Sequence, residues 1–104
     1  MITSNTELLH GYRISKQLGL VSGSTVRAKH IGRDFMAGLK NIVGGELKGY
    51  TELMSEAREE AYLRMLEEAK KMGANGVINV RFSTASITQG ASELLVYGTA
   101  VIIE

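Results

Sequence analysis

The stretch ELLVYGTAVII (residues 93–103) is apolar on both faces of the strand that its length and composition predict. Successive side chains of a strand point to opposite sides. One face therefore carries Leu94, Val96, Ala100 and Ile102, and the other carries Leu95, Tyr97, Val101 and Ile103. A strand of this kind needs cover on both faces. Two helices of a small chain can cover one face, so we expect a second subunit on the other.

Two more strands are expected before it. Residues 77–84, VINVRFST, alternate in polarity and place Ile78, Val80 and Phe82 on one face. Residues 11–22, GYRISKQLGLVS, alternate through Ile14, Lys16, Leu18 and Leu20. The sequence Ser22-Gly23-Ser24 is typical of a turn and predicts the end of that first strand.

Between these strands the apolar period changes to that of a helix. A short helix is predicted from residue 31 to Gly44, with apolar side chains at Ile31, Phe35, Leu39, Ile42 and Val43. A longer helix is predicted over residues 50–72, with Thr51 as its N-cap and Gly73 as its left-handed stop. Its buried stripe consists of Met54, Ala57, Ala61, Met65, Ala69 and Met72. Leu63 lies on the face opposite this stripe.

The order of elements makes the chain an α+β protein with three strands and two helices. A length of 104 residues is sufficient for one domain, spanning residues 1–104, and too short for two. The apolar fraction of 44% argues against disorder.

Composition excludes several classes of function. The chain has no cysteine, which excludes thiolate catalysis, thiolate metal ligands and disulfides. The start, MITSNTELLH, lacks the pattern of a secretory signal, and the longest nearly apolar run, residues 94–103, is about half of a membrane span. We therefore expect a cytoplasmic protein without membrane contact.

Charge is divided unevenly along the chain. Residues 1–50 carry seven Lys/Arg against three Asp/Glu, and residues 51–104 carry five against eight. With 6% aromatic residues, the basic half lacks the stacking side chains and charge density of a nucleic-acid surface, so no nucleic-acid partner is expected. Oppositely charged halves can meet across a subunit interface, although a solvated surface is the more common explanation of such a pattern.

The glycines of VGGELKG (residues 43–49) raise the question of a phosphate loop. Such a loop follows a strand and ends in Lys-Ser/Thr, whereas these glycines follow a predicted helix and Gly49 precedes Tyr-Thr. Gly44 and Gly45 are therefore expected to form a corner between two helices.

His30 and Asp34 are the candidate metal ligands. They lie four residues apart at the start of the first predicted helix, on one face, and would hold a divalent ion only with further ligands. Alternatively, Asp34 is favoured there by the helix dipole alone. No spacing of Ser, His and Asp suggests catalysis, so we expect no catalytic residues and no enzyme.

Several stretches together resemble the YbjQ-like family of heavy-metal-binding proteins. They are GLVSG (19–23), GRDFMAGLKNIVGG (32–45), AREEA (57–61), EAKKMGANGVI (68–78) and YGTAV (97–101), in the family's order over most of the chain. The resemblance implies a β-α-α-β-β subunit with a three-stranded antiparallel sheet and two helices on one face, like a dodecin subunit. It also implies a ring-shaped homopentamer. The family's characteristic positions fall on Arg33, Asp34, Gly44, Gly45, Arg58, Glu68 and Gly98.

Two classes of function follow. The first is an oligomer that binds a metal or small ligand through His30, Asp34 or carboxylates that symmetry brings together. The second is a structural or regulatory interaction module with no ligand of its own. In both, the expected partner is a further copy of the chain, with Leu63, Leu95, Tyr97, Val101 and Ile103 as the predicted interface.

Overall fold

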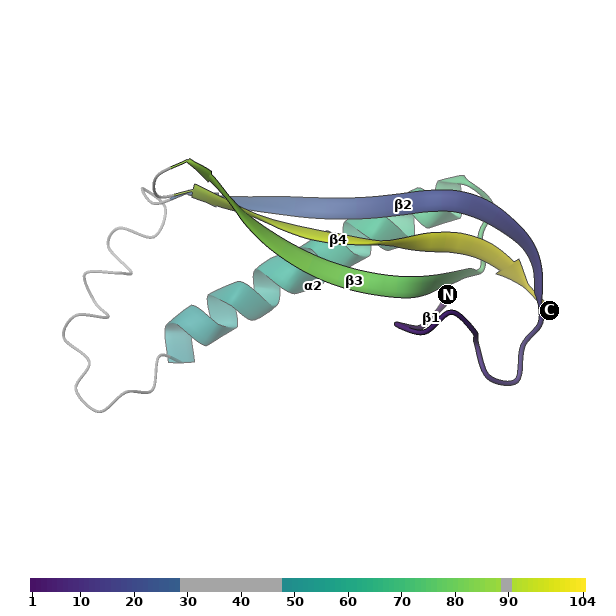
Figure 1. The fold of residues 1–104 in the computed structure, drawn as a ribbon. Coiled ribbons are helices and arrows are strands. Elements are labelled where there is room, and N and C mark those ends of the chain that lie inside the picture. Colours follow the sequence, from purple (N-terminus) through teal and green to yellow (C-terminus); the bar gives the residue numbers. More distant parts are fainter. Residues whose placement is uncertain (29–47, 89–90) are drawn as a thin grey trace.

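The computed structural model of the chain describes residues 1–28, 48–88 and 91–104. Its elements are β1 (Ile2–Thr3), β2 (Ile14–Ala28), α2 (Lys48–Lys71), β3 (Gly76–Thr88) and β4 (Ala91–Ile103). The expected α+β class is confirmed, with α2 lying across one face of a sheet (Figure 1). The predicted helix over residues 31–44 and the corner at Gly44 and Gly45 fall outside the described residues.

The sheet has four strands in the order β1-β3-β4-β2. The strands β2 and β3 both run antiparallel to β4, as expected, but β1 pairs with β3 in parallel, so the sheet is mixed. The expectation of three strands in an antiparallel sheet was therefore incomplete. A strand of two residues is too short to show any periodicity in sequence.

Helix α2 begins at Lys48, so Thr51 lies inside the helix and is not its N-cap. The other end is as predicted. Gly73 has a φ of 86°, its N–H donates to Lys70 O at 3.0 Å, and the N–H of Ala74 donates to Ala69 O at 3.1 Å. These two bonds form a Schellman motif, in which glycine takes the left-handed position without strain.

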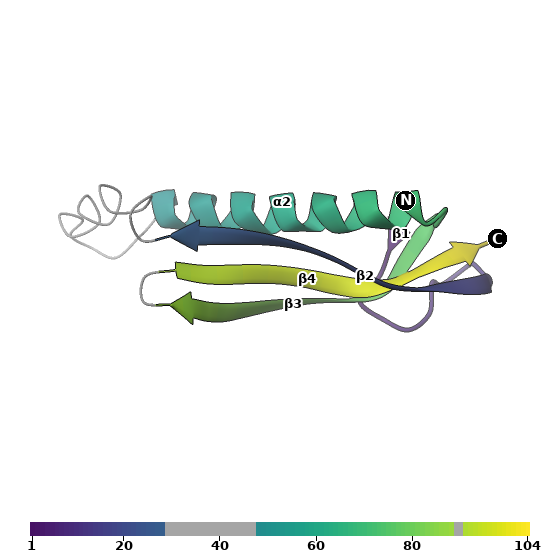
Figure 2. The same cartoon turned by 90° about the horizontal axis from the view of Figure 1, so that it is seen from above.

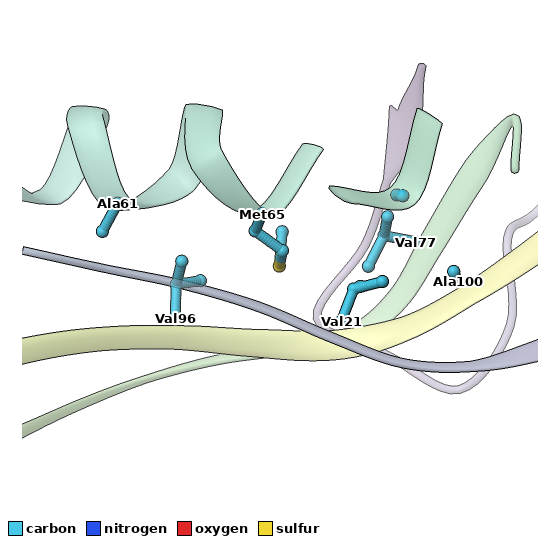
Figure 3. Packing of buried hydrophobic residues seen from close by; sticks show 7 residues of the cluster. Val21, Ala61, Met65, Val77, Val96 and Ala100 are labelled. Carbon is cyan, nitrogen blue, oxygen red and sulfur yellow. The ribbon is translucent and has the colours of Figure 1, made fainter. Parts of the chain in front are cut away.

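The core is the layer between α2 and the sheet. The helix contributes Ala61, Met65 and Ala69, and the sheet contributes Val21, Val77, Val96 and Ala100 (Figure 3). The predicted stripe is thus confirmed at its centre, where Ala57, Ala61, Met65 and Ala69 are fully buried, while Met72 is exposed. Burying a side chain the size of Met65 contributes about 1.5–3 kcal/mol, so this layer is the main source of stability.

The prediction that the strand ends at Ser22-Gly23-Ser24 was wrong, because Gly23 lies in the middle of β2. A Cβ at this position would lie 2.1 Å from Ala61 O and 2.5 Å from Met65 N, both backbone atoms of α2. The glycine therefore permits close approach of the helix and makes no turn. Nearby, the buried Thr25 hydroxyl donates to Ala57 O at 3.3 Å, which fixes the same contact.

A bulge in β3 changes which residues share a face. The pairing with β4 shifts by one residue between Ile78 and Arg81, where Asn79 has a φ of 54°. Asparagine tolerates this conformation better than most residues. Ile78 consequently lies on the face away from α2, whereas Val80 packs against the core below the helix, so the expectation of a common face for Ile78, Val80 and Phe82 was wrong.

Among the described residues, no helix combines the length and the apolar composition that crossing a bilayer requires.

Candidate functional site

The structure does not place the predicted metal ligands. His30, Arg33 and Asp34 fall outside the described residues. Within the described ranges, no three side chains of His, Cys, Asp or Glu come close enough together to hold a metal ion. Because a protein metal site normally has three or four ligands, the described part of a single chain does not fit a metal.

The most distinctive surface is the side of the sheet away from α2. Residues that pair across antiparallel strands point to the same side, and the pairs Gly23–Val96 and Thr25–Leu94 are buried beneath the helix. Because side chains alternate along a strand, the residues next to these buried ones point away from α2. On this surface, which we call the uncovered face, the large apolar side chains of β2 and β4 are Leu20, Val26, Leu95 and Tyr97.

In the described part of the chain, no element covers the uncovered face, and Figure 2 shows α2 on the other side of the sheet only. Leu20 is 80% exposed, Val26 50% and Tyr97 39%, and Leu95 is half-buried. The exposure of Tyr97 and the partial exposure of Leu95 agree with the face on which the sequence placed them. Whether they form a subunit interface stays a prediction.

The uncovered face also holds residues that sequence reasoning missed. Leu20 was assigned to the same alternation as Leu18, but Leu18 packs against the core below α2. A register irregularity between Gln17 and Gly19, where Gly19 has a φ of 131°, separates the two leucines. The Leu-Gly-Leu sequence was the available signal, because an isolated glycine in a strand often marks a bulge.

The expectation that the chain cannot cover Val101 and Ile103 was wrong. Val101 is fully buried and Ile103 is 7% exposed, in a second cluster with Leu9 and Ile78. The segment between β1 and β2 places Leu9 against this end of the sheet. Its backbone is fixed to the bulge in β3, since the N–H of Asn79 donates to Thr6 O and that of Val80 to Ser4 O, both at 3.0 Å.

Leu63 is where the helical periodicity places it. It lies on the outer face of α2 and is 54% exposed. Its role in an interface is likewise a prediction.

Two grooves run along the flanks of α2. One, of about 510 Å³, lies at the β2 edge and is lined by Leu20–Ser24 of the strand and by Arg64, Glu67, Glu68 and Met72 of the helix. The other, of about 350 Å³, lies toward β3 and is lined by Ser55, Arg58, Glu59, Tyr62 and Phe82. We call them the β2 groove and the β3 groove.

Three of the family's characteristic positions lie within the described residues, two of them in these grooves and one in the packed interior. Arg58 lines the β3 groove and donates to the Ser55 hydroxyl at 3.2 Å. Glu68 lines the β2 groove and forms an exposed ion pair with Lys71 at 3.3 Å. Gly98 is a packing position, because a Cβ there would lie 2.8 Å from Val77 Cγ1 and 2.9 Å from Ile78 O.

Proteins with sequences similar to this chain indicate the family to which it belongs. A UPF0145 protein of Hahella chejuensis is 64% identical over 104 residues and aligns over the whole of both chains. A UPF0145 protein of Dehalococcoides mccartyi is 59% identical, again over the whole of both. A third, from Thermus thermophilus, is 57% identical over 100% of this chain and 91% of its own.

A solved structure shows a similar fold. The chain aligns with a protein of unknown function from Pediococcus pentosaceus, of the DUF74 family, with a TM-score of 0.65 over 100% of this chain and 98% of that one. The sequence identity is 16%, so the similarity concerns the fold alone.

The model of the YbjQ family, described as "Putative heavy-metal-binding", matches residues 1–104. Because this match spans the full length and agrees with relatives at 57–64% identity, the chain belongs to the YbjQ-like, UPF0145 family.

Proposed function

We propose that the chain is a non-enzymatic cytoplasmic protein that assembles into a ring of five identical copies and binds a metal ion or small ligand in the assembled state. The observation that carries the proposal is the uncovered face. Within residues 1–28, 48–88 and 91–104, this apolar face has no second layer over it, and a sheet face of this kind needs cover.

The energetic argument rests on the exposed side chains. Leaving a large aliphatic side chain in water forgoes on the order of 1.5–3 kcal/mol. Leu20 and Val26 are both at least half exposed, and Tyr97 lies between them on the central strand. Contiguous apolar patches of this kind usually mark interaction sites.

Ring closure and copy number have separate support. Cyclic symmetry buries the same surface in every copy and leaves no unpaired end. The number five comes from the resemblance to the YbjQ-like family.

The ligand is the less determined part of the proposal. The family's description supports a metal ion. In a ring, each copy would contribute its own His30 and Asp34, and symmetry would supply the ligands that one chain lacks. Imidazole and carboxylate ligands suit borderline divalent ions such as Zn²⁺.

One observation favours the second candidate, an interaction module with no ligand of its own. No group of three potential ligands forms within the described ranges of one chain. In this case the assembled surface itself would be the functional unit.

The two candidates differ in metal uptake. We would titrate the purified, metal-free oligomer with Zn²⁺ in a calorimeter and compare His30→Ala with His10→Ala. His10, the other histidine of the chain, is an exposed residue before β2 and serves as the matched control. Binding that His30→Ala abolishes and His10→Ala preserves supports the metal-binding function. No binding at micromolar Zn²⁺ favours the interaction module.

A further inference from the structure

The two outer edges of the sheet differ in how they are protected. At the edge formed by β2, the Arg64 guanidinium of α2 donates to Ser24 O and also to Glu60 Oε1. Val26, two residues further along β2, is not without a partner either. Covering an edge strand with a helix is a common protection against pairing with another chain. The β2 edge is therefore capped.

The β3 edge has no comparable cap beyond Val80. β1 pairs with β3 only at Gly76 and Val77. The N-terminal segment then follows β3 as far as Val80, whose N–H donates to Ser4 O at 3.0 Å. Residues 82–88 are all exposed, and within the described ranges no strand pairs with the outer side of this part. It also contains no charged residue and no proline, which are the residues that discourage pairing at natural edges.

The alternation of the backbone identifies the groups that face this open edge. The N–H of Val80 points away from β4, because it donates to Ser4 O. In an antiparallel strand this direction recurs at every second residue. The N–H and C=O groups of Phe82, Thr84 and Ser86 are therefore directed outward.

The pairing on the other side of β4 leads to the same assignment. Since Ser24 O points to the outer edge of β2, the neighbouring Gly23 forms the hydrogen bonds with its partner Val96. The backbone groups of Val96 are thus directed toward β2, and those of Leu95 toward β3, where they bond to Ser83. The residues on either side of Ser83 consequently face outward.

The charged side chains that adjoin this edge balance one another. On the side of the sheet that carries α2, the β3 groove holds one cation and one anion, Arg58 and Glu59. On the other side, Arg81 precedes the open part of β3, and Glu93 pairs with Ala85. Because each side contributes one charge of each sign, the edge can meet a copy of itself without net repulsion.

From these features we infer that residues 82–86 of β3 pair in antiparallel fashion with the same residues of a second copy, about a two-fold axis at Thr84. Phe82 then lies opposite Ser86 of the other copy, and Thr84 lies opposite itself. All three outward residues find a partner in this register, and each bonded pair exchanges two hydrogen bonds. Threonine pairs across strands are favourable. Because the β2 edge is capped, the extended sheet ends after two copies.

This contact goes beyond the proposed ring and does not depend on it. It uses the edge of β3, whereas the ring was proposed from the uncovered face. An edge contact of five residues buries far less than the roughly 1,000 Å² of a stable interface. We therefore expect it to form at submillimolar concentration, between copies that belong to separate assemblies.

The first test uses single cysteines in this cysteine-free chain. In Thr84→Cys, the two-fold axis brings the new residues opposite each other at a Cα separation of about 5.5 Å, which a disulfide can span. Ser83→Cys is the matched control. Its two copies would lie two residues apart along neighbouring strands, about 8 Å, beyond the roughly 7 Å limit. Under mild oxidation at submillimolar concentration, non-reducing gels should show covalent dimers of Thr84→Cys and little dimer of Ser83→Cys.

The second test removes an outward N–H group without a cross-link. Thr84→Pro deletes the central donor and leaves the bonds to β4 in place, and proline is tolerated at such edge positions. Thr84→Val keeps the donor and is the control. In sedimentation over a concentration series, Thr84→Pro should raise the dissociation constant of the edge contact at least about tenfold, with unchanged circular dichroism. Thr84→Val should associate like the wild type.

The outcomes separate this contact from the ring. Equal cross-linking of Thr84→Cys and Ser83→Cys, or association of Thr84→Pro like that of the wild type, would overturn the two-fold pairing and leave the ring untouched. Selective cross-linking at Thr84 in a protein that is monomeric at micromolar concentration would support the pairing and overturn the ring.

Discussion

Gly23→Ala should be among the most destabilising single substitutions in this chain. The new Cβ would lie 2.1 Å from Ala61 O, 2.5 Å from Met65 N and 2.9 Å from Arg64 Cβ. An ordinary contact begins near 3.4 Å, so the strand and the helix would have to separate by about 3.4 − 2.1 = 1.3 Å. Two of the three obstructing atoms belong to the backbone of α2, which cannot rotate out of the way.

The expected cost follows from that separation. A gap of 0.5–1 Å already forfeits about a quarter to a half of the dispersion energy at a contact. The displaced layer includes the fully buried Ala61 and Met65. Overpacking a core usually costs about 1–3 kcal/mol, and we expect Gly23→Ala to lie at or above the upper end.

Urea unfolding followed by circular dichroism at one fixed protein concentration would measure this loss, because the stability of an assembling protein depends on concentration. Ser22→Ala is the matched control, since Ser22 is exposed and points away from α2. We expect the control to change the free energy of unfolding by less than about 0.5 kcal/mol. A similarly small change for Gly23→Ala would refute the close packing of α2 on β2.

Three further predictions test the core, the assembly face and the metal ligands. Met65→Ala should destabilise the protein by about 2–5 kcal/mol in urea unfolding, because Met65 is fully buried between α2 and the sheet; a loss below about 1 kcal/mol would contradict that placement. Tyr97→Lys should shift the assembly toward folded monomers in light scattering, since Tyr97 is 39% exposed on the uncovered face. The control Glu59→Lys, on the exposed side of α2, should not shift it. An unchanged assembly in both variants would show that the uncovered face is not buried between copies. Asp34→Ala should weaken Zn²⁺ binding by at least about tenfold in calorimetry if Asp34 is one of the few ligands of a metal site, and unchanged binding would remove Asp34 from that site.

Much of the fold follows from periodicity in the sequence. The alanine-rich stripe of α2 was predictable because it follows one clear period over more than ten residues, and β4 was predictable because it is a nearly continuous apolar run of strand length. The Schellman stop at Gly73 was predictable from local chemistry alone.

Long-range contacts explain what sequence reasoning missed. Gly23 resembles a turn residue in sequence, and only the passage of α2 over β2 gives it a different role. Likewise, the burial of Val101 depends on Leu9, which is distant in the chain and belongs to no periodic segment. Such packing depends on which segments meet in space, and local sequence patterns do not show which segments these are.

The same distinction between periodic elements and irregularities applies to the candidate site. The exposure of Leu63 and Tyr97 followed from their positions in α2 and β4. The exposure of Leu20 did not, because the irregularity at Gly19 reverses the face that a simple alternation assigns to it.

The central claim is that one copy of the chain is incomplete without others. Native mass spectrometry of the untagged protein at micromolar concentration tests it most directly. With a mass of 11.3 kDa per chain, five copies would give 5 × 11.3 = 56.5 kDa, and any bound metal would appear as added mass. We expect this species to be the dominant one. A well-folded monomer at 11.3 kDa would contradict it.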